Sequence, residues 1–424
     1  MAATTDRARF YLEQYVPELQ EFSRKKIFTP AEITAITAKR SDFEHVLNAR
    51  GSTPADYARY AVYESNLDSL RKKRCQRLGI KGSKTFSGQR TVFFVLDRAT
   101  KKFPGDMGLW MQYIQFCQKE KANKKLARVF TSVLRLHPRE YGMWVLAAKH
   151  YAEGMGDMST ARGYMQRGLR FCKDERKLYL EYVRLEMVYL AKLAARRKVL
   201  GLDERRQEKA QDEDDNMISL PTITAEDINP DAGKGIEEVD EAALKRLANA
   251  PAYTGAIPIA IFDSAMKQVK NAAEAAEEFF NLVFEFSAVP STAVILEHIL
   301  DHLRTAHPNT VETVVCEAKL ALFGVDMNSA DFPPALGRGL ASLKSGTNAV
   351  PEKQRKRFAE KAIALLLAWG GAPDQMDEDV STVLAASMNR YLKLAGRAKE
   401  ETGAALLHKA RGGDAWNQEL MIEG

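Results

Sequence analysis

The chain has 424 residues, of which 45% are hydrophobic and 28% are charged, a composition typical of a folded, water-soluble protein. Its longest apolar run, residues 362–369, falls well short of the roughly 20 residues that a membrane-spanning helix needs. Residues 1–14 lack the apolar stretch of a secretory signal, so none is expected. The four cysteines lie far apart, which disfavours a disulfide framework or a zinc site and favours a reducing, intracellular compartment.

The net charge of +6 conceals an asymmetry between the two halves of the chain. Residues 1–200 carry 39 lysines and arginines against 20 acidic residues, whereas residues 201–424 carry 23 against 36. A strongly basic half suits RNA or acidic proteins as partners. The acidic half is poorly suited to follow a phosphate backbone.

In chain order, residues 1–50 are expected to be helical. Thr29 is the expected N-cap of one helix, with Pro30 at its first position and Glu32 supplying a negative charge in its first turn. Residues 51–54, Gly-Ser-Thr-Pro, are expected to end that helix and to begin the next.

The helix after this turn carries the pattern aromatic-x-x-aromatic-x-x-x-Glu. The intact copies are Tyr57, Tyr60 and Glu64, and then Tyr179, Tyr182 and Glu186. The degraded copies are Trp110, Tyr113 and Cys117, and then Trp144, Ala147 and Tyr151. Offsets of three and seven place all three positions on one helix face. We expect the aromatic pair to pack within its own hairpin and the glutamate to hydrogen-bond across to the next repeat.

A spacing of 34 residues relates these segments. It links three pairs, Pro104 and Trp110, then Pro138 and Trp144, and in a looser third copy Cys172 and Tyr179. The second helix of each unit supplies an arginine and an aromatic residue, which are Arg128 and Phe130 and then Arg162 and Tyr164. Self-similarity with a period of 20–50 residues is typical of a solenoid. The sequence therefore predicts an all-α solenoid of helical hairpins with these residues in the repeat core.

The second half is less regular. Residues 201–255 contain the run Asp212–Asp215 and few aromatics, as expected of a mobile acidic linker. Helical periodicity returns near residue 257, with helices expected at 271–286, 292–305, 309–323, about 353–369 and about 377–396. The predicted organisation is an N-terminal helical segment (1–50), a basic repeat array (51–200), the acidic linker (201–255) and acidic, degenerate repeats (256–424).

The tandem pattern resembles HAT (half-a-TPR) repeats, whose first helix carries W-x-x-Y-x-x-x-E and whose second carries a small residue followed by arginine and an aromatic. Ala127–Phe130 and Ala161–Tyr164 fit that second helix. The resemblance implies a protein of RNA processing. It leaves open a HAT-repeat scaffold of the spliceosome or of messenger-RNA 3′-end cleavage.

The N-terminal 120 residues indicate which family of RNA-processing proteins the chain resembles. The segments concerned are Pro17–Leu19, Ile27–Thr29, Lys39–Arg40, Phe43–Glu44, Leu70–Arg71, Leu109–Trp110 and Phe116–Cys117. Together, these segments resemble the U-three small nucleolar RNA-associated protein six family. The resemblance implies a nucleolar, non-enzymatic scaffold of the small-subunit processome, required for ribosomal RNA precursor cleavage and 18S rRNA maturation. It implies no cofactor or catalytic residue. The implied partners are β-propeller proteins of the periodic tryptophan protein subcomplex, U-three small nucleolar RNA and the ribosomal RNA precursor.

Two basic runs are candidate contacts for RNA or an acidic partner. The first comprises Arg71, Lys72, Lys73, Arg74 and Arg77, and the second comprises Lys119, Lys121, Lys124 and Lys125. Each phosphate that such a run neutralises adds a salt-dependent contribution to binding. The alternative is that both are ordinary solvated faces of helices and loops.

Two further motifs resemble those of enzymes, but each lacks a residue that the chemistry requires. His298 and His302 lie one helical turn apart, as in a zinc hydrolase, but no third ligand is evident. Residues 79–85 approach a phosphate-binding loop, yet Ser83 stands where glycine must precede Lys84. The preferred function remains that of a scaffold.

Overall fold

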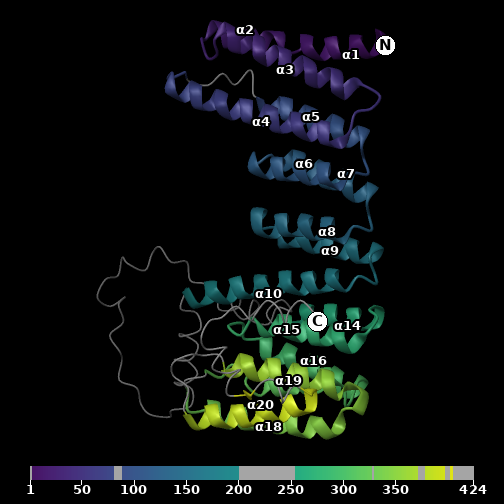
Figure 1. Ribbon diagram of the computed structural model, residues 1–424, viewed down its shortest axis with the longest axis vertical. Helices are drawn as coiled ribbons and strands as arrows, with labels where there is room; N and C mark the ends of the chain where they lie inside the picture. The colour runs from purple at the N-terminus through teal and green to yellow at the C-terminus, as the bar shows by residue number, and fades with distance from the viewer. Residues whose placement is uncertain are drawn as a thin grey trace, which may run out of the picture. The chain divides into compact units, whose positions relative to one another are not determined.

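The computed structural model describes residues 2–80, 88–199, 254–326, 329–370, 378–396 and 402–403, and these residues form helices and their connections without a strand (Figure 1). The chain divides into two compact units, Met1–Ala147 and Ala148–Gly424. The predicted linker lies almost entirely outside the described residues.

The N-terminal unit is a stack of consecutive helices. Its elements are α1 (Ala2–Glu13), α2 (Val16–Arg24), α3 (Pro30–Asn48), α4 (Pro54–Arg77), α5 (Gly88–Lys102), α6 (Met107–Lys119), α7 (Asn123–Leu136) and most of α8 (Tyr141–Lys149). From α2 to α7 each helix contacts the one that follows it, and α4 also reaches α6. Contacts of this kind, between nearest and next-nearest helices, are those of a helical-repeat array.

Local sequence signals set where these helices begin. The Thr29 hydroxyl accepts a bond from the backbone N–H of Glu32, and the Glu32 carboxylate accepts one from the Thr29 N–H at 2.8 Å. This reciprocal capping box, with Pro30 at the first helical position, confirms the predicted start of α3. At α4 the Thr53 N–H donates to the Asp56 carboxylate in the same way.

The six-residue spacing from proline to tryptophan, which recurs 34 residues later, has a direct physical cause. The indole Nε1 of Trp110 donates to the Pro104 carbonyl at 2.8 Å, and that of Trp144 donates to the Pro138 carbonyl at 2.9 Å. His137 Nε2 lies 2.7 Å from the same Pro104 carbonyl. Each tryptophan therefore satisfies a backbone oxygen in the turn before its own helix while burying its ring.

A buried ion-pair network joins three helices near the start of this unit. The Arg40 side chain on α3 is only 1% exposed and forms bonds of 2.7 and 2.9 Å to the Glu64 carboxylate on α4. It also donates to Glu18 on α2 at 3.2 Å. Two fixed bonds to one carboxylate hold the guanidinium in a single orientation.

The direction of this pairing corrects one expectation. The glutamate of the aromatic motif bonds to an arginine on the preceding helix, not to the next repeat. Arg162 on α9 repeats the arrangement with Glu186 on α10, at 2.7 and 2.8 Å. In both cases 24 residues separate the partners, so the turn between two adjacent helices brings them together.

The C-terminal unit is also all-α in its described part. It contains the end of α8, the π-helical turn η1 (His150–Met155), α9 (Met158–Phe171), α10 (Arg176–Val199), α14 (Ala256–Gln268), α15 (Ala272–Phe284), α16 (Thr292–Ala306), α17 (Val311–Leu320), α18 (Phe332–Ala349), the short 3-10 turn η2 (Glu352–Gln354), α19 (Arg355–Gly370) and α20 (Glu378–Ala395). Successive helices from α14 to α20 pack on each other. Helices at the positions of α15, α16, α17, α19 and α20 were predicted, whereas α18 was missed.

Together these observations confirm an all-α helical-repeat fold. None of the four cysteines, all of which the structure describes, forms a disulfide. Burial raises the pKa of Cys117 to about 12, which keeps its thiol protonated at neutral pH. Within the described segments, no helix combines the length and apolarity that a bilayer crossing requires.

Candidate functional site

The repeat-core candidates are buried inside their units, with two exceptions, Arg162 and Arg128. Those that are buried are Tyr57, Tyr60, Glu64, Trp110, Tyr113, Phe130, Trp144, Tyr164, Tyr179, Tyr182 and Glu186. Arg162 is partly exposed, pairs with Glu186 and lies 5.4 Å from the Tyr189 ring centroid. Arg128 is exposed. The position 24 residues after it holds Ala152 in place of a glutamate, so the sequence supplies no matching carboxylate.

Three cations of the first basic run are engaged within the protein. Arg71 and Lys72 both bind the carboxylate of Asp68, at 2.8 and 2.9 Å. Arg74 binds both oxygens of Glu32 at 2.6 and 2.7 Å and lies over the Phe28 ring at 4.7 Å. Arg71 and Lys72 pair within α4, and Arg74 joins α4 to α3, so little of their charge is left for a partner.

Lys73 and Arg77 differ from their neighbours. Both are exposed, and within the described part of the chain neither has an ion pair. They are four residues apart on α4 and therefore lie on one face. Of the first run, these two cations are the most available to a partner.

The second basic run lies where α6 gives way to α7. Lys119, Lys121 and Lys124 are exposed and have no ion pair among the described residues. Lys125 is committed instead, since its ammonium lies 4.3 Å from the Phe93 ring centroid and 3.9 Å from Asp97. Lys121 has a left-handed backbone, φ 52°, in a helix-ending turn closed by a bond from Ala122 N–H to the Cys117 carbonyl.

The structure brings the two basic runs together. Lys72 on α4 lies 3.8 Å from Glu120 at the end of α6, and Gln89 at the start of α5 also donates to Glu120. The ends of α4 and α6 thus lie on one side of the N-terminal unit. We call this surface the basic edge. It comprises Lys73, Lys119, Lys121 and Lys124, the exposed lysines of the two runs that have no ion pair among the described residues.

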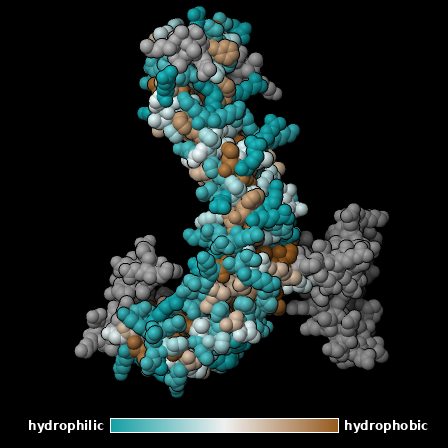
Figure 2. Space-filling view, turned by 90° about the vertical axis from the view of Figure 1, so that its right-hand side faces the viewer, coloured by the Kyte–Doolittle hydropathy of each residue, from teal (hydrophilic) through white to brown (hydrophobic). Residues whose placement is uncertain are grey.

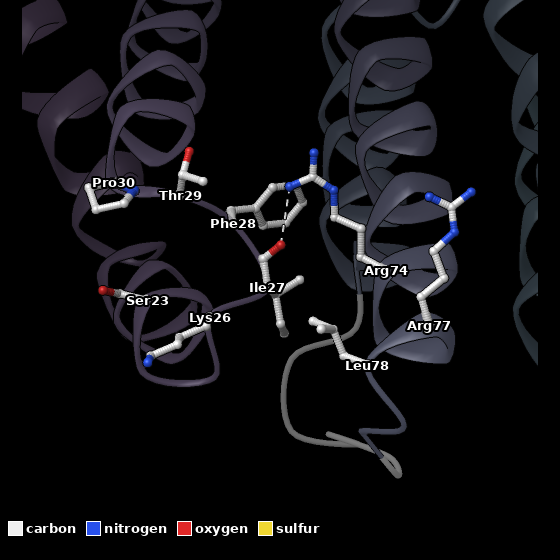
Figure 3. Close-up of a pocket in the computed structure, with 9 residues that line it drawn as sticks. All are labelled: Ser23, Lys26, Ile27, Phe28, Thr29, Pro30, Arg74, Arg77 and Leu78. Atoms are coloured by element: carbon white, nitrogen blue, oxygen red, sulfur yellow. Dashed lines mark hydrogen bonds between the residues drawn. The ribbon is translucent and has the colours of Figure 1, made fainter.

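A recess lies beside the basic edge, between the α2–α3 turn and the last turn of α4 (Figure 3). Its volume is about 580 Å³. It is lined by Ser23, Lys26, Ile27, Phe28, Thr29, Pro30, Arg74, Arg77 and Leu78. Beneath it lies a small apolar cluster that includes Phe22 and Ile36. In the space-filling view, the surface of the N-terminal unit, at the top, is mainly hydrophilic with small scattered apolar areas (Figure 2).

The walls of the recess are held by fixed interactions. Arg74 donates to the Ile27 carbonyl at 3.2 Å in addition to its two bonds to Glu32. The Arg74 guanidinium, helped by the Thr29 backbone N–H, lowers the pKa of Glu32 from its ordinary value of 4.5 to about 2. Glu32 is thus ionised and neutralised by Arg74 at neutral pH.

Sequence reasoning missed three residues of the recess, Ser23, Lys26 and Leu78. Lys26 follows α2 with φ 52°, and its turn closes through a bond from the Ile27 N–H to the Phe22 carbonyl. Glycine or asparagine usually occupies that left-handed position, and a lysine there costs on the order of 1 kcal/mol. Leu78 is 54% exposed. Only the packing of α2 against α4 reveals that they face one recess.

The zinc alternative has a different geometry from the one its motif suggests. His298 Nε2 contacts the Asp263 carboxylate at 2.8 Å, and His302 packs edge-on against Phe262. Burial, followed by the charge of His307, lowers the pKa of His302. Within the described residues, no group of three histidine, cysteine or acidic side chains is placed to hold a metal ion.

Stacked helix pairs with an adjoining basic surface define the class as a helical-repeat protein that presents side chains along an extended face. Comparison with known families identifies a more specific group within this structural class. Residues 12–93 match the family model described as U3 small nucleolar RNA-associated protein 6, and the predicted resemblance to that family is thereby confirmed. This segment contains the Arg40 network, the recess and the first basic run.

Curated relatives agree with the family match. The chain is 39% identical over 198 residues to U3 small nucleolar RNA-associated protein 6 of Schizosaccharomyces pombe, which is 46% of this chain and 41% of that protein. It is 35% identical over 185 residues to the human homologue, covering 43% and 31% of the two chains. A Dictyostelium discoideum homologue is 26% identical over 330 residues, 74% of this chain and 53% of its own. The chain thus spans no more than about half the length of these relatives.

Proposed function

We propose that this protein is a non-enzymatic scaffold subunit of the U3 small nucleolar ribonucleoprotein, within the small-subunit processome. The observation that carries the proposal is the match of residues 12–93, together with relatives named for their association with U3 small nucleolar RNA. The helical-repeat fold supports it, since such arrays bind partners along their surfaces. The proposed location is the nucleolus, and the proposed process is cleavage of the ribosomal RNA precursor leading to 18S rRNA.

Within this function we assign the basic edge to RNA. Lys73, Lys119, Lys121 and Lys124 are exposed cations from two neighbouring helix ends, without ion pairs in the described part of the chain. Lysines that carry no internal partner can neutralise phosphates without first breaking an ion pair. The buried aromatic rings of the repeat core are unavailable for base stacking, because their exposure is below a tenth.

The direct test is a native pull-down of the tagged full chain, reading both RNA and protein. We expect U3 small nucleolar RNA together with β-propeller processome subunits, and a nucleolar signal for a fluorescent fusion. Recovery of spliceosomal RNAs or 3′-end cleavage factors would transfer the function to the other HAT-repeat scaffolds. Absence of any specific RNA or protein would contradict the scaffold proposal itself.

A further inference from the structure

Beyond this function, the geometry points to a peptide-docking site in the recess between the α2–α3 turn and the end of α4. We propose that it receives an acidic segment of a partner protein that inserts one aliphatic side chain. The recess has the volume of an ordinary small binding site, about 580 Å³. It is distinct in chemistry from the lysines of α6 and α7.

The apolar part of the proposal depends on Leu78. This side chain is 54% exposed at the end of α4 and faces Ile27 across the recess in Figure 3. Pro30 adds a further apolar surface on the opposite wall. An aliphatic side chain placed between Leu78 and Ile27 would remove exposed apolar area from water.

The charged part depends on Lys26 and Arg77. They lie on opposite sides of the recess in Figure 3, both are exposed, and within the described residues neither has an ion pair. The carboxylate of Glu32, which contacts the lining residue Arg74, is neutralised by its two bonds from that arginine. A ligand therefore meets net positive charge on both sides of an apolar centre, which is complementary to an acidic segment.

The same contacts favour a peptide over a nucleotide in this recess. A base would need an open aromatic face on which to stack. The one aromatic ring of the lining, Phe28, is only 4% exposed, and its face is covered by the Arg74 guanidinium at 4.7 Å. Aliphatic surfaces offer a base no such platform. Because the bonds of Arg74 fix the walls in advance, little ordering is required on binding.

The test measures fluorescence anisotropy of labelled probes with the purified full chain at low salt. The probes are a short acidic peptide with one central leucine, the same peptide with serine in that place, its amide analogue of neutral charge, and oligouridylate RNA. We expect the acidic leucine peptide to bind best. The double variant Lys26→Glu/Arg77→Glu should weaken it by about tenfold or more, because two attractive charges become repulsive.

Matched variants separate an effect of the recess from an effect of net charge or of misfolding. Lys39→Glu/Arg50→Glu makes the same change of charge at exposed positions outside the recess and should leave peptide binding nearly unchanged. Leu78→Ser should remove the preference for the leucine peptide over the serine peptide, with an unchanged thermal midpoint as the sign of intact folding. Equal losses in both charge-reversal variants, a stronger effect on oligouridylate than on peptide, or binding of none of the peptides would each overturn the proposal. Because no U3 component is present, these outcomes are independent of the pull-down.

Discussion

Individual side chains show how the repeat is built. Trp110 combines a ring that is 4% exposed with an indole N–H bonded to the Pro104 carbonyl. That carbonyl also lies 2.7 Å from His137 Nε2, so loss of the indole donor need not leave it unsatisfied. The two contributions of this residue, burial and hydrogen bonding, can therefore be separated by substitution.

For Trp110, replacement by phenylalanine should cost about 0.5–1.5 kcal/mol, the usual net value of one hydrogen bond. Replacement by alanine should cost about 3–5 kcal/mol, because it also removes most of the buried ring. Urea unfolding of the two variants measures both. If Trp110→Ala kept full stability but lost RNA binding, the ring would be a stacking platform for bases, and the assignment of Trp110 to the core would be wrong.

Glu32 provides a pH-dependent prediction. Its pKa is lowered from 4.5 to about 2, chiefly by Arg74. When folding lowers the pKa of a carboxyl group, that group stabilises the folded protein at pH values above its pKa in the unfolded chain. This stabilisation is lost as the pH falls through the pKa of the group in the folded protein. Glu32→Gln should therefore lower the thermal midpoint at pH 7.

The difference between the Glu32→Gln variant and the parent protein should shrink as the pH falls from 4.5 toward 2. Thermal unfolding measured across that interval checks it. A difference that stayed constant down to pH 2 would show that the Arg74 bonds do not hold Glu32 ionised in solution.

At the scale of the element, α18 shows how packing overrides local preference. Its sequence begins Phe332-Pro333-Pro334 and contains several glycines, which is why no helix was predicted there. Proline is accepted because it falls in the first turn, where the N–H has no helical partner. Gly339 and Gly346 allow α18 to lie close against α17 and α19.

This explanation predicts opposite effects for two glycines of α18. A methyl group at Gly346 would clash with the Val314 side chain, whereas one at Gly337 would meet nothing within 4 Å. Gly346→Ala should therefore destabilise the C-terminal unit by about 1–3 kcal/mol, as overpacking usually does. Gly337→Ala should stabilise it by up to about 1 kcal/mol, because alanine is the better helix former. Denaturant unfolding measures the change in the free energy of unfolding for both variants. Equal changes would contradict the close packing of α18 against α17.

Across the whole molecule, the sign of the net charge differs between the two halves. The basic residues concentrate in the first 200 positions, and the exposed members of the two basic runs that have no ion pair in the described part are Lys73, Arg77, Lys119, Lys121 and Lys124. Ion pairing within the protein uses Arg71, Lys72 and Arg74, so the raw count of basic residues overstates what a partner can reach. RNA binding is therefore expected to depend on few residues.

Binding of the full chain to single-stranded RNA should weaken as salt rises, with a slope of about −0.7 per neutralised phosphate on a double-logarithmic plot. The triple variant Lys119→Glu/Lys121→Glu/Lys124→Glu should reduce both affinity and slope. Lys39→Glu/Arg50→Glu/Lys101→Glu, which changes the same charge at other exposed positions, is the control. Equal losses in both variants would mean that net charge alone attracts RNA.

The sequence alone determined the features that depend on neighbouring residues. The capping box at Thr29 and Glu32 spans three positions, and the tryptophan bonds to Pro104 and Pro138 span six, so each leaves a readable local pattern. Helical periodicity likewise predicted most helices and the repeat class. The acidic linker stays a prediction.

Only the tertiary structure decided which charges are paired between helices. Arg74 pairs with Glu32, which is 42 residues away in the sequence, and Lys72 approaches Glu120, which is 48 residues away. Only the packing of helices brings such distant residues together. The same packing places Lys26 opposite Leu78 and so creates the recess. Ion pairs between helices and the shape of the surface arise between elements, and for that reason no local pattern of residues encodes them.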